Sequence, residues 1–189
     1  MKIFHSTVTA LAVFLSLAAC SASTSMSPDQ SGTPADVDGP LPGTSTAVTS
    51  PVDEARAQGV QTYRQMWTAY ATAGTTADWQ SPELARYATG GALSTLTRGL
   101  FGYRELGIVT RGQPVLNPTV SSVEPLGLPI KVIVSDCGDS TTWTKHYADN
   151  GALADGEPGG KRHINAVVEK QVDGSWKVSD FGVHEVGTC

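Results

Sequence analysis

The hydrophobic pattern of this 189-residue chain changes its period partway along the sequence. Between residues 52 and 74 the apolar positions recur at helical spacing, at Val60, Tyr63, Met66, Trp67 and Tyr70. This spacing predicts a long amphipathic helix with one broad apolar face, and Gly74 is expected to end it. Two acidic residues, Asp53 and Glu54, lie where a helix N-terminus favours negative charge.

Two shorter helical segments are expected next. Ser81, Pro82 and Glu83 form a helix start signal, with serine as the N-cap and proline at the first helical position. We expect Gly90-Gly91 to break this helix. A second run then places leucine and tyrosine along one side and ends near Gly107, with its apolar positions at Leu93, Leu96, Leu100 and Tyr103.

From residue 115 onward the pattern is typical of strands. Apolar and polar residues alternate in several short stretches, and Asp173-Gly174 is a strong signal for a hairpin turn. Strands are expected within residues 115–126, 129–137, 143–147, 163–172 and 175–186. Helices followed by a run of antiparallel strands predict an α+β domain, with the helices on one face of a curved sheet.

The first 20 residues have the pattern of an export signal. Lys2 precedes an apolar run over residues 8–19, which is too short for a stable transmembrane helix. The run ends in Leu17-Ala18-Ala19-Cys20, which resembles the lipobox of bacterial lipoproteins. That resemblance implies a diacylglycerol group on the Cys20 thiol and an extracytoplasmic protein anchored to the cell membrane. The alternative is an ordinary secreted protein that loses Cys20 on cleavage.

Residues 21–51 differ from both of their neighbours in composition. They are rich in Ser, Thr, Pro and Gly, and they contain no aromatic residue and no Lys or Arg. Such a segment cannot bury enough apolar surface to offset its ordering entropy, so a disordered tether is expected. A flexible chain of this length spans roughly 30 Å. Residues 52–189 have the size of a single domain.

Charge and cysteine usage narrow the function further. The net charge is −5, and Lys161-Arg162 is an isolated basic pair, which argues against a nucleic-acid partner. Export would place Cys137 and Cys189 in an oxidising compartment, so we expect a disulfide between them. A reactive thiol or a metal ligand is the alternative for either cysteine.

The ordered set of segments resembles NTF2-like cone domains of the SnoaL and ketosteroid-isomerase type, in particular small actinobacterial lipoproteins of unknown function. The resemblance rests on the long first helix, "PELARYATGGAL", "DCGDS" and "VDGSWKVSDFGV". It implies a sheet wrapped into a cone whose mouth can hold a small apolar ligand. Many such domains pair through the outer face of the sheet, which leaves a homodimer open.

The residues that could line such a pocket are aromatic or titratable: Tyr63, Trp67, Tyr70, Asp136, His163 and Asp180. None of them aligns with a catalytic position of the family, so no catalytic role is assigned. Helical spacing also explains the three aromatic residues as core.

Metal binding is not expected from the remaining candidates. Asp136 and Asp139 lie three positions apart, and they are more simply explained as residues that cap a turn. Three histidines, His146, His163 and His184, fall on strands predicted for one sheet, but without the short spacing of metal ligands. No metal and no cofactor are therefore expected.

These observations favour a non-enzymatic, lipid-anchored domain in the cell envelope. We expect it to bind a small apolar ligand or an envelope protein. The alternative is a pocket enzyme of the isomerase or hydratase type, which would need an isolated carboxyl or imidazole group inside the cone.

Overall fold

The computed structural model describes residues 49–154, 156 and 159–189. The predicted signal segment, with Cys20, and most of the predicted tether lie outside the described residues. Within the described part of the chain, no helix combines the length and the hydropathy that crossing a bilayer requires.

The predicted first helix is present as α1, Pro51–Gly74. Ser50 caps it, because its Oγ accepts a hydrogen bond from the Asp53 backbone N–H at 3.1 Å. Tyr63, Met66 and Trp67 are buried on one face. The apolar face inferred from spacing is therefore the face that meets the core.

The second helical region contains α2, Pro82–Tyr87, and α3, Gly90–Glu105. The break between them falls at Ala88 and Thr89, so the expectation that Gly90-Gly91 would form it is wrong by two residues. The cause is a long-range contact: the Thr89 N–H donates to the Val178 carbonyl at 2.9 Å. Gly90 and Gly91 instead begin α3.

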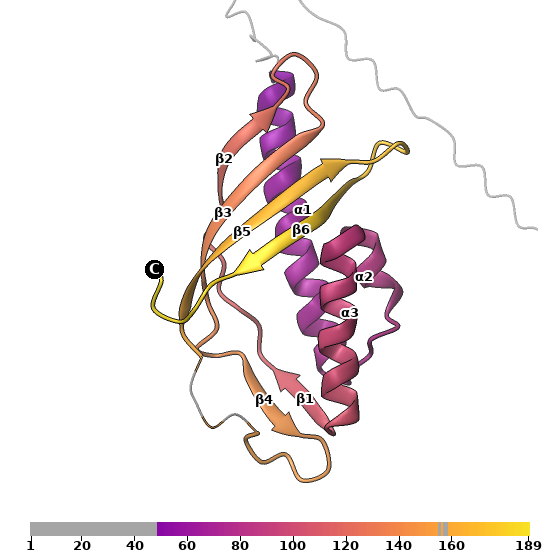
Figure 1. Ribbon diagram of the computed structural model, residues 1–189, viewed down its shortest axis with the longest axis vertical. Coiled ribbons are helices and arrows are strands. Elements are labelled where there is room, and N and C mark those ends of the chain that lie inside the picture. Colours follow the sequence, from indigo (N-terminus) through magenta and orange to yellow (C-terminus); the bar gives the residue numbers. More distant parts are fainter. Residues whose placement is uncertain (1–48, 155, 157–158) are drawn as a thin grey trace, which may run out of the picture. The chain divides into compact units, whose positions relative to one another are not determined.

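The main sheet has four antiparallel strands in the order β2-β3-β5-β6 (Figure 1). Their bounds are Thr119–Glu124 for β2, Lys131–Asp139 for β3, Lys161–Lys170 for β5 and Trp176–Val183 for β6. Each falls largely within a predicted stretch, and the Asp173-Gly174 turn joins β5 to β6. Register shifts interrupt the β2–β3 pairing between Val120 and Ser122 and the β5–β6 pairing between Val167 and Val168.

A second, two-stranded sheet lies at the lower end of the domain in Figure 1. It pairs β1, Ile108–Arg111, with β4, Thr144–Tyr147. Strand β1 was not predicted, because its sequence does not alternate between apolar and polar residues. His146 belongs to this sheet, so the placement of all three histidines on one sheet is wrong.

The core lies between the inner face of the main sheet and the helices, which lie on one side of it (Figure 1). Helix α1 approaches the sheet closely at Gly59, where an added Cβ would lie 2.7 Å from Val132 Cγ1. The fully buried side chains come from α1, α2, α3 and the sheet: Tyr63, Met66, Leu84, Leu96, Leu100, Val132, Val134, Val168 and Val178. This is the predicted α+β arrangement, with N-terminal helices packed on a curved antiparallel sheet.

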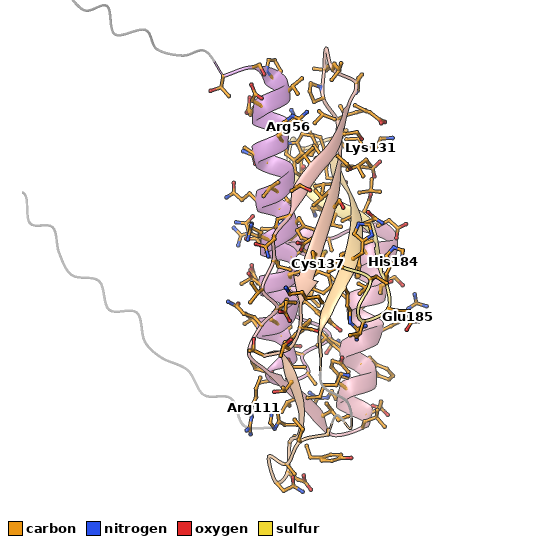
Figure 2. The ribbon with its side chains drawn as sticks, turned by 90° about the vertical axis from the view of Figure 1, so that its left-hand side faces the viewer. Arg56, Arg111, Lys131, Cys137, His184 and Glu185 are labelled. Atoms are coloured by element: carbon orange, nitrogen blue, oxygen red, sulfur yellow. A yellow bond between two sulfur atoms is a disulfide. The ribbon has the colours of Figure 1, made fainter. Side chains whose placement is uncertain are left out.

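The predicted disulfide between Cys137 and Cys189 is confirmed, with a Cα–Cα distance of 5.9 Å. It fastens the C-terminal segment, residues 184–189, to the outer side of the sheet, where Figure 2 labels Cys137 and His184. The segment also runs beside the start of β5, since the His184 N–H donates to the His163 carbonyl at 3.0 Å. Its position is thus held by both covalent and backbone bonds.

Candidate functional site

A cavity of about 520 Å³ lies at the end of the core where the main sheet meets β1 and β4. Its walls come from both helical and strand elements and from the C-terminal segment: Trp67, Tyr103, Thr110, Pro114, Gly138, Ser140, Trp143, Lys145, Gly156, Gly159, Arg162, Ile164, Val183 and Val186. The volume is within the range of small-molecule sites in proteins.

The cavity exists because the inner face of the sheet changes from large to small residues. Along β3 the buried positions are Val132, Val134, Asp136 and then Gly138. Gly138 pairs in register with Arg162 of β5, and Ser140 follows it. Aliphatic side chains fill the space at one end of the sheet, whereas at the other end there is too little side-chain volume to do so.

Four aromatic rings form one side of this region. Trp67 of α1 is at its centre, with ring centroids 6.1 Å from Tyr70, 6.1 Å from Trp143 and 5.4 Å from Phe181. All of these contacts are edge-to-face, the arrangement that aromatic pairs favour. Trp67 and Trp143 therefore present well-supported surfaces to the cavity.

Three buried polar atoms among the described residues have no hydrogen-bond partner: Trp67 Nε1, Trp143 Nε1 and Thr110 Oγ1. All three residues line the cavity. Trp67 and Thr110 are only 6% and 3% exposed. Most buried polar groups in proteins are paired, so these three residues leave hydrogen-bonding capacity unused in the wall of the cavity.

The Trp67 indole has one close polar neighbour, the Tyr63 hydroxyl. Proximity to this N–H slightly opposes the rise in the Tyr63 pKa. The two groups do not meet the distance and angle requirements of a hydrogen bond. Trp67 Nε1 thus keeps its capacity to donate.

Two basic side chains complete the lining, and none of the described lining residues is acidic. Lys145 lies over the Tyr103 ring, with Nζ 5.8 Å from the ring centroid. Arg162 is half-buried and forms no salt bridge with any described residue. Arg162 thus brings to the cavity wall a positive charge that no described residue pairs.

A buried carboxyl group lies one layer deeper in the core. Asp136 is 2% exposed, and it accepts hydrogen bonds from the Tyr63 hydroxyl at 2.9 Å and from the Asn117 backbone N–H at 2.7 Å. Burial, together with the nearby Asp136 charge, raises the pKa of Tyr63 far above its ordinary value. Neither residue lines the cavity.

The remaining pocket candidates lie outside the cavity. Burial raises the pKa of Tyr70, as does the neighbouring Tyr103, and Tyr70 packs behind Trp67 and Trp143. Asp180 is exposed, and its Oδ1 accepts from the Phe181 N–H at 3.0 Å. Of the six candidates, the structure places only Trp67 in the cavity wall.

The histidines do not converge on one centre. His163 lies on the outer face, where its Nε2 is 2.9 Å from Ser135 Oγ and its ring stacks on His184 at 5.3 Å. His146 Nδ1 is 2.9 Å from the Gly151 carbonyl oxygen. Within the described ranges, no three His, Cys, Asp or Glu side chains are grouped as metal ligands would be.

Asp139 has the turn role that the sequence suggested. Its Oδ1 accepts from the Thr141 backbone N–H at 2.9 Å, and hydrogen bonds from Thr141 lower the pKa of the carboxyl group. Asp136 takes no part in this turn, because its side chain points to the opposite, inner face.

Sequence reasoning did not identify Trp143, Lys145 or Arg162. Arg162 could have been found, because it has the same alternation as the inward-facing Ile164, Ala166 and Val168 of β5. An arginine at an inward position of a strand is unusual enough to suggest a site. Trp143 and Lys145 give no such signal, since they lie in or beside a four-residue strand of the second sheet.

No protein-family model matches the chain, and no curated protein matches it. Among solved structures, similarity is found to the intermembrane space region of the chloroplast protein ARC6, at 15% identity and a TM-score of 0.47, over 68% of this chain and 95% of that one. A ketosteroid isomerase-like protein from Erwinia carotovora atroseptica matches at 15% identity and a TM-score of 0.41, over 68% of this chain and 94% of that one. The protein Aln2 from a Streptomyces species matches at 12% identity and a TM-score of 0.46, over 72% of this chain and 94% of that one. Similarity at this level says nothing about activity, ligand or partner.

Proposed function

We propose that the domain is a ligand-binding module that holds a small molecule with an apolar body in the cavity at the end of the sheet. The observation that carries this proposal is the cavity of about 520 Å³, whose wall residues Trp67, Thr110 and Trp143 also hold three buried polar atoms without a hydrogen-bond partner among the described residues. An unpaired buried donor costs about 1–3 kcal/mol, and a ligand or ordered water that accepts from it removes that cost. The apolar walls at Ile164 and Val186 supply the remaining contact surface.

Protein association through the outer face of the sheet is less well supported. Protein association through a sheet face is favoured when that face exposes a continuous apolar surface. The outward positions of β3 and β5 instead include polar side chains at Ser135, His163, Asn165 and Glu169. A homodimer formed through this face would have to bury these groups.

We further propose that the whole protein is extracytoplasmic and attached to the membrane through a lipid on Cys20. The motif Leu17-Ala18-Ala19-Cys20 supports this proposal, and so does the Cys137–Cys189 disulfide, because disulfides persist mainly in oxidising compartments. Incorporation of labelled palmitate by the wild type, and its loss in Cys20→Ala, would be the expected result. A Cys20→Ala protein that stays equally membrane-bound would contradict it.

A second candidate function, a pocket enzyme of the isomerase or hydratase type, is favoured by the buried Asp136 carboxyl group. For catalysis this carboxyl would have to contact a substrate, yet it is bonded to Tyr63 and Asn117 and lies outside the cavity lining. The non-enzymatic function therefore agrees better with the geometry. An activity that Asp136→Asn abolishes without loss of ligand binding would favour the enzyme.

The proposed binding function can be tested with a neutral apolar probe and with protein from its own host. Native mass spectrometry is expected to find a small molecule retained by the domain. Added 2-naphthalenemethanol is expected to change the fluorescence of Trp67 and Trp143 in a saturable way. A cavity-narrowing variant, Gly138→Val, should weaken this binding, because Gly138 lies in the wall and an added Cβ would meet only the flexible end of Ile164 within 3 Å. Empty protein in every preparation and no saturable change would contradict the proposal.

A further inference from the structure

The proposed function leaves the chemistry of the ligand open, and the polar lining of the cavity narrows it. We propose that the ligand is an organic anion, with a carboxylate or equivalent acceptor group bound by Arg162 and an aromatic or alicyclic body between the apolar walls. This inference rests on the proposed function, because it concerns the same cavity. It is supported by the hydrogen-bond donors in the cavity lining and by the lack of acidic side chains among the described lining residues.

Arg162 is placed to be the anion-binding group. It shares the inward alternation of Ile164 on β5, and its partner in register is Gly138, which has no side chain to fill the space opposite. The cavity lining contains both residues. A guanidinium group offers a planar pair of donors that matches the two oxygens of a carboxylate. Because Arg162 has no salt-bridge partner among the described residues, this pairing remains available.

The unpaired polar atoms of the wall residues also favour a ligand that carries hydrogen-bond acceptors. An indole N–H can only donate, so Trp67 and Trp143 both require an acceptor. The Thr110 hydroxyl can donate as well. A cationic ligand would meet these donors and the Arg162 guanidinium group, and it would find no acidic group among the described lining residues. A ligand rich in acceptors is therefore favoured over a cation.

The apolar part of the lining defines the body of the ligand. Tyr103, Pro114 and Ile164 offer ring or aliphatic surface, and Val183 and Val186 close the side next to the C-terminal segment. A volume of about 520 Å³ accommodates a body of two or three fused rings together with its acidic group. The class is thus a compact aromatic or alicyclic carboxylate.

A matched pair of probes tests the charge requirement directly in the full chain. 2-Naphthoate and 2-naphthalenemethanol share one ring system and differ in the anionic group. Titration calorimetry at low salt should give at least about tenfold tighter binding of the carboxylate, because only the carboxylate can form a charge-assisted hydrogen bond with Arg162, and a factor of ten corresponds to about 1.4 kcal/mol. Raising the salt concentration should weaken only the binding of the carboxylate.

A matched pair of variants tests the assignment to Arg162. Arg162→Gln should lower the affinity for 2-naphthoate about tenfold and leave that for the alcohol within about twofold. Lys161→Gln removes the same charge from the adjacent, exposed position on the opposite face, and it should change neither affinity. Circular dichroism verifies that both variants are folded.

The outcomes separate this inference from the proposed function. Equal wild-type affinity for both probes would overturn the anion inference and leave the binding function intact, and this comparison does not depend on any variant being folded. Equal losses for both probes in Arg162→Gln would likewise overturn it. Saturable binding of neither probe would overturn both proposals.

Discussion

The two ends of the core between sheet and helices are built on opposite principles. At the packed end, Val132 touches α1 at Gly59, and the buried Tyr63 and Asp136 satisfy each other by a hydrogen bond. At the cavity end, Gly138 leaves space open, and polar atoms of Trp67 and Trp143 have no partner among the residues that the structure describes. Volume and hydrogen bonds are complete at one end and incomplete at the other.

This difference suggests a division of labour within one small domain. Close packing at the first end supplies stability, since buried aliphatic groups and paired polar groups both favour the folded state. The second end forgoes part of that stabilisation, as functional sites in proteins commonly do. Variants at the two ends should therefore separate stability from binding.

The largest expected effect is on stability at the packed end. Val132 is fully buried against α1, and Val132→Ala is expected to reduce the free energy of unfolding by about 2–4 kcal/mol, because buried methyl groups are lost and a cavity is left behind. Val183→Ala, at the edge of the cavity, serves as the control and should cost less than about 1 kcal/mol, because Val183 is 42% exposed. Urea denaturation measures both. Equal losses would contradict the proposed difference between the ends.

Loss of the disulfide should reduce both the stability of the domain and its affinity for the ligand. Replacement of Cys137 and Cys189 by serine opens a loop with a sequence separation of 52 and is expected to reduce stability by about 2–4 kcal/mol. It should also weaken ligand binding, because the C-terminal segment contributes Val186 to the cavity wall. Denaturation and calorimetry give the two results. Unchanged affinity would mean that this segment is not part of the site.

The buried hydrogen bond offers a smaller and more specific test. Tyr63→Phe removes the donor to Asp136 Oδ2 and is expected to cost about 1–3 kcal/mol. Tyr147→Phe is a suitable control, because Tyr147 is 43% exposed. Probe binding should be nearly unchanged in both variants. A large loss of binding in Tyr63→Phe would place this pair in the site after all.

The same variant predicts a change in the alkaline pH dependence. The pKa of Tyr63 is raised in the folded state, so its contribution to stability is complete below about pH 10, the ordinary tyrosine pKa, and falls as the pH rises further. The loss approaches about 1.4 kcal/mol for each pH unit. Thermal unfolding between pH 9 and 11 should therefore be less steeply pH-dependent in Tyr63→Phe. Identical slopes would contradict this contribution.

The smallest expected effect is a gain of stability, in contrast to the losses expected for the other variants. Thr110→Val replaces a buried hydroxyl group that has no partner in the described part of the chain with a methyl group of similar size, and it should stabilise the ligand-free protein by up to about 1 kcal/mol. Thermal unfolding without ligand measures this change. A loss of stability would show that the hydroxyl group already has a partner in solution.

Much of the fold could be predicted from local pattern alone. The periodic spacing of Tyr63 and Trp67 located α1, and alternation located the four strands of the main sheet. Strand β1 was missed because its sequence, Ile108-Val109-Thr110-Arg111, does not alternate between apolar and polar residues. The break after α2 was misplaced because it depends on a hydrogen bond to β6. Local signals fail where long-range pairing decides the structure.

The site was harder to predict than the fold for a related reason. Trp67 was recognised, but whether an aromatic residue lines a cavity or fills the core depends on the neighbours that the fold brings to it. Here the deciding neighbour is Gly138, whose missing side chain leaves the space in front of Arg162. Single-residue chemistry could have flagged only the inward-facing arginine.

The central claim is that the unpaired indole groups of the cavity meet a ligand, and the four tryptophans of the chain allow a direct measurement. Trp67 and Trp143 line the cavity, whereas Trp79 and Trp176 do not and serve as internal controls. In a ¹H–¹⁵N NMR titration with 2-naphthoate, the account predicts saturable shifts of the indole signals of Trp67 and Trp143, with those of Trp79 and Trp176 unchanged. Saturable binding that leaves the first two signals in place, or moves only the other two, would contradict it.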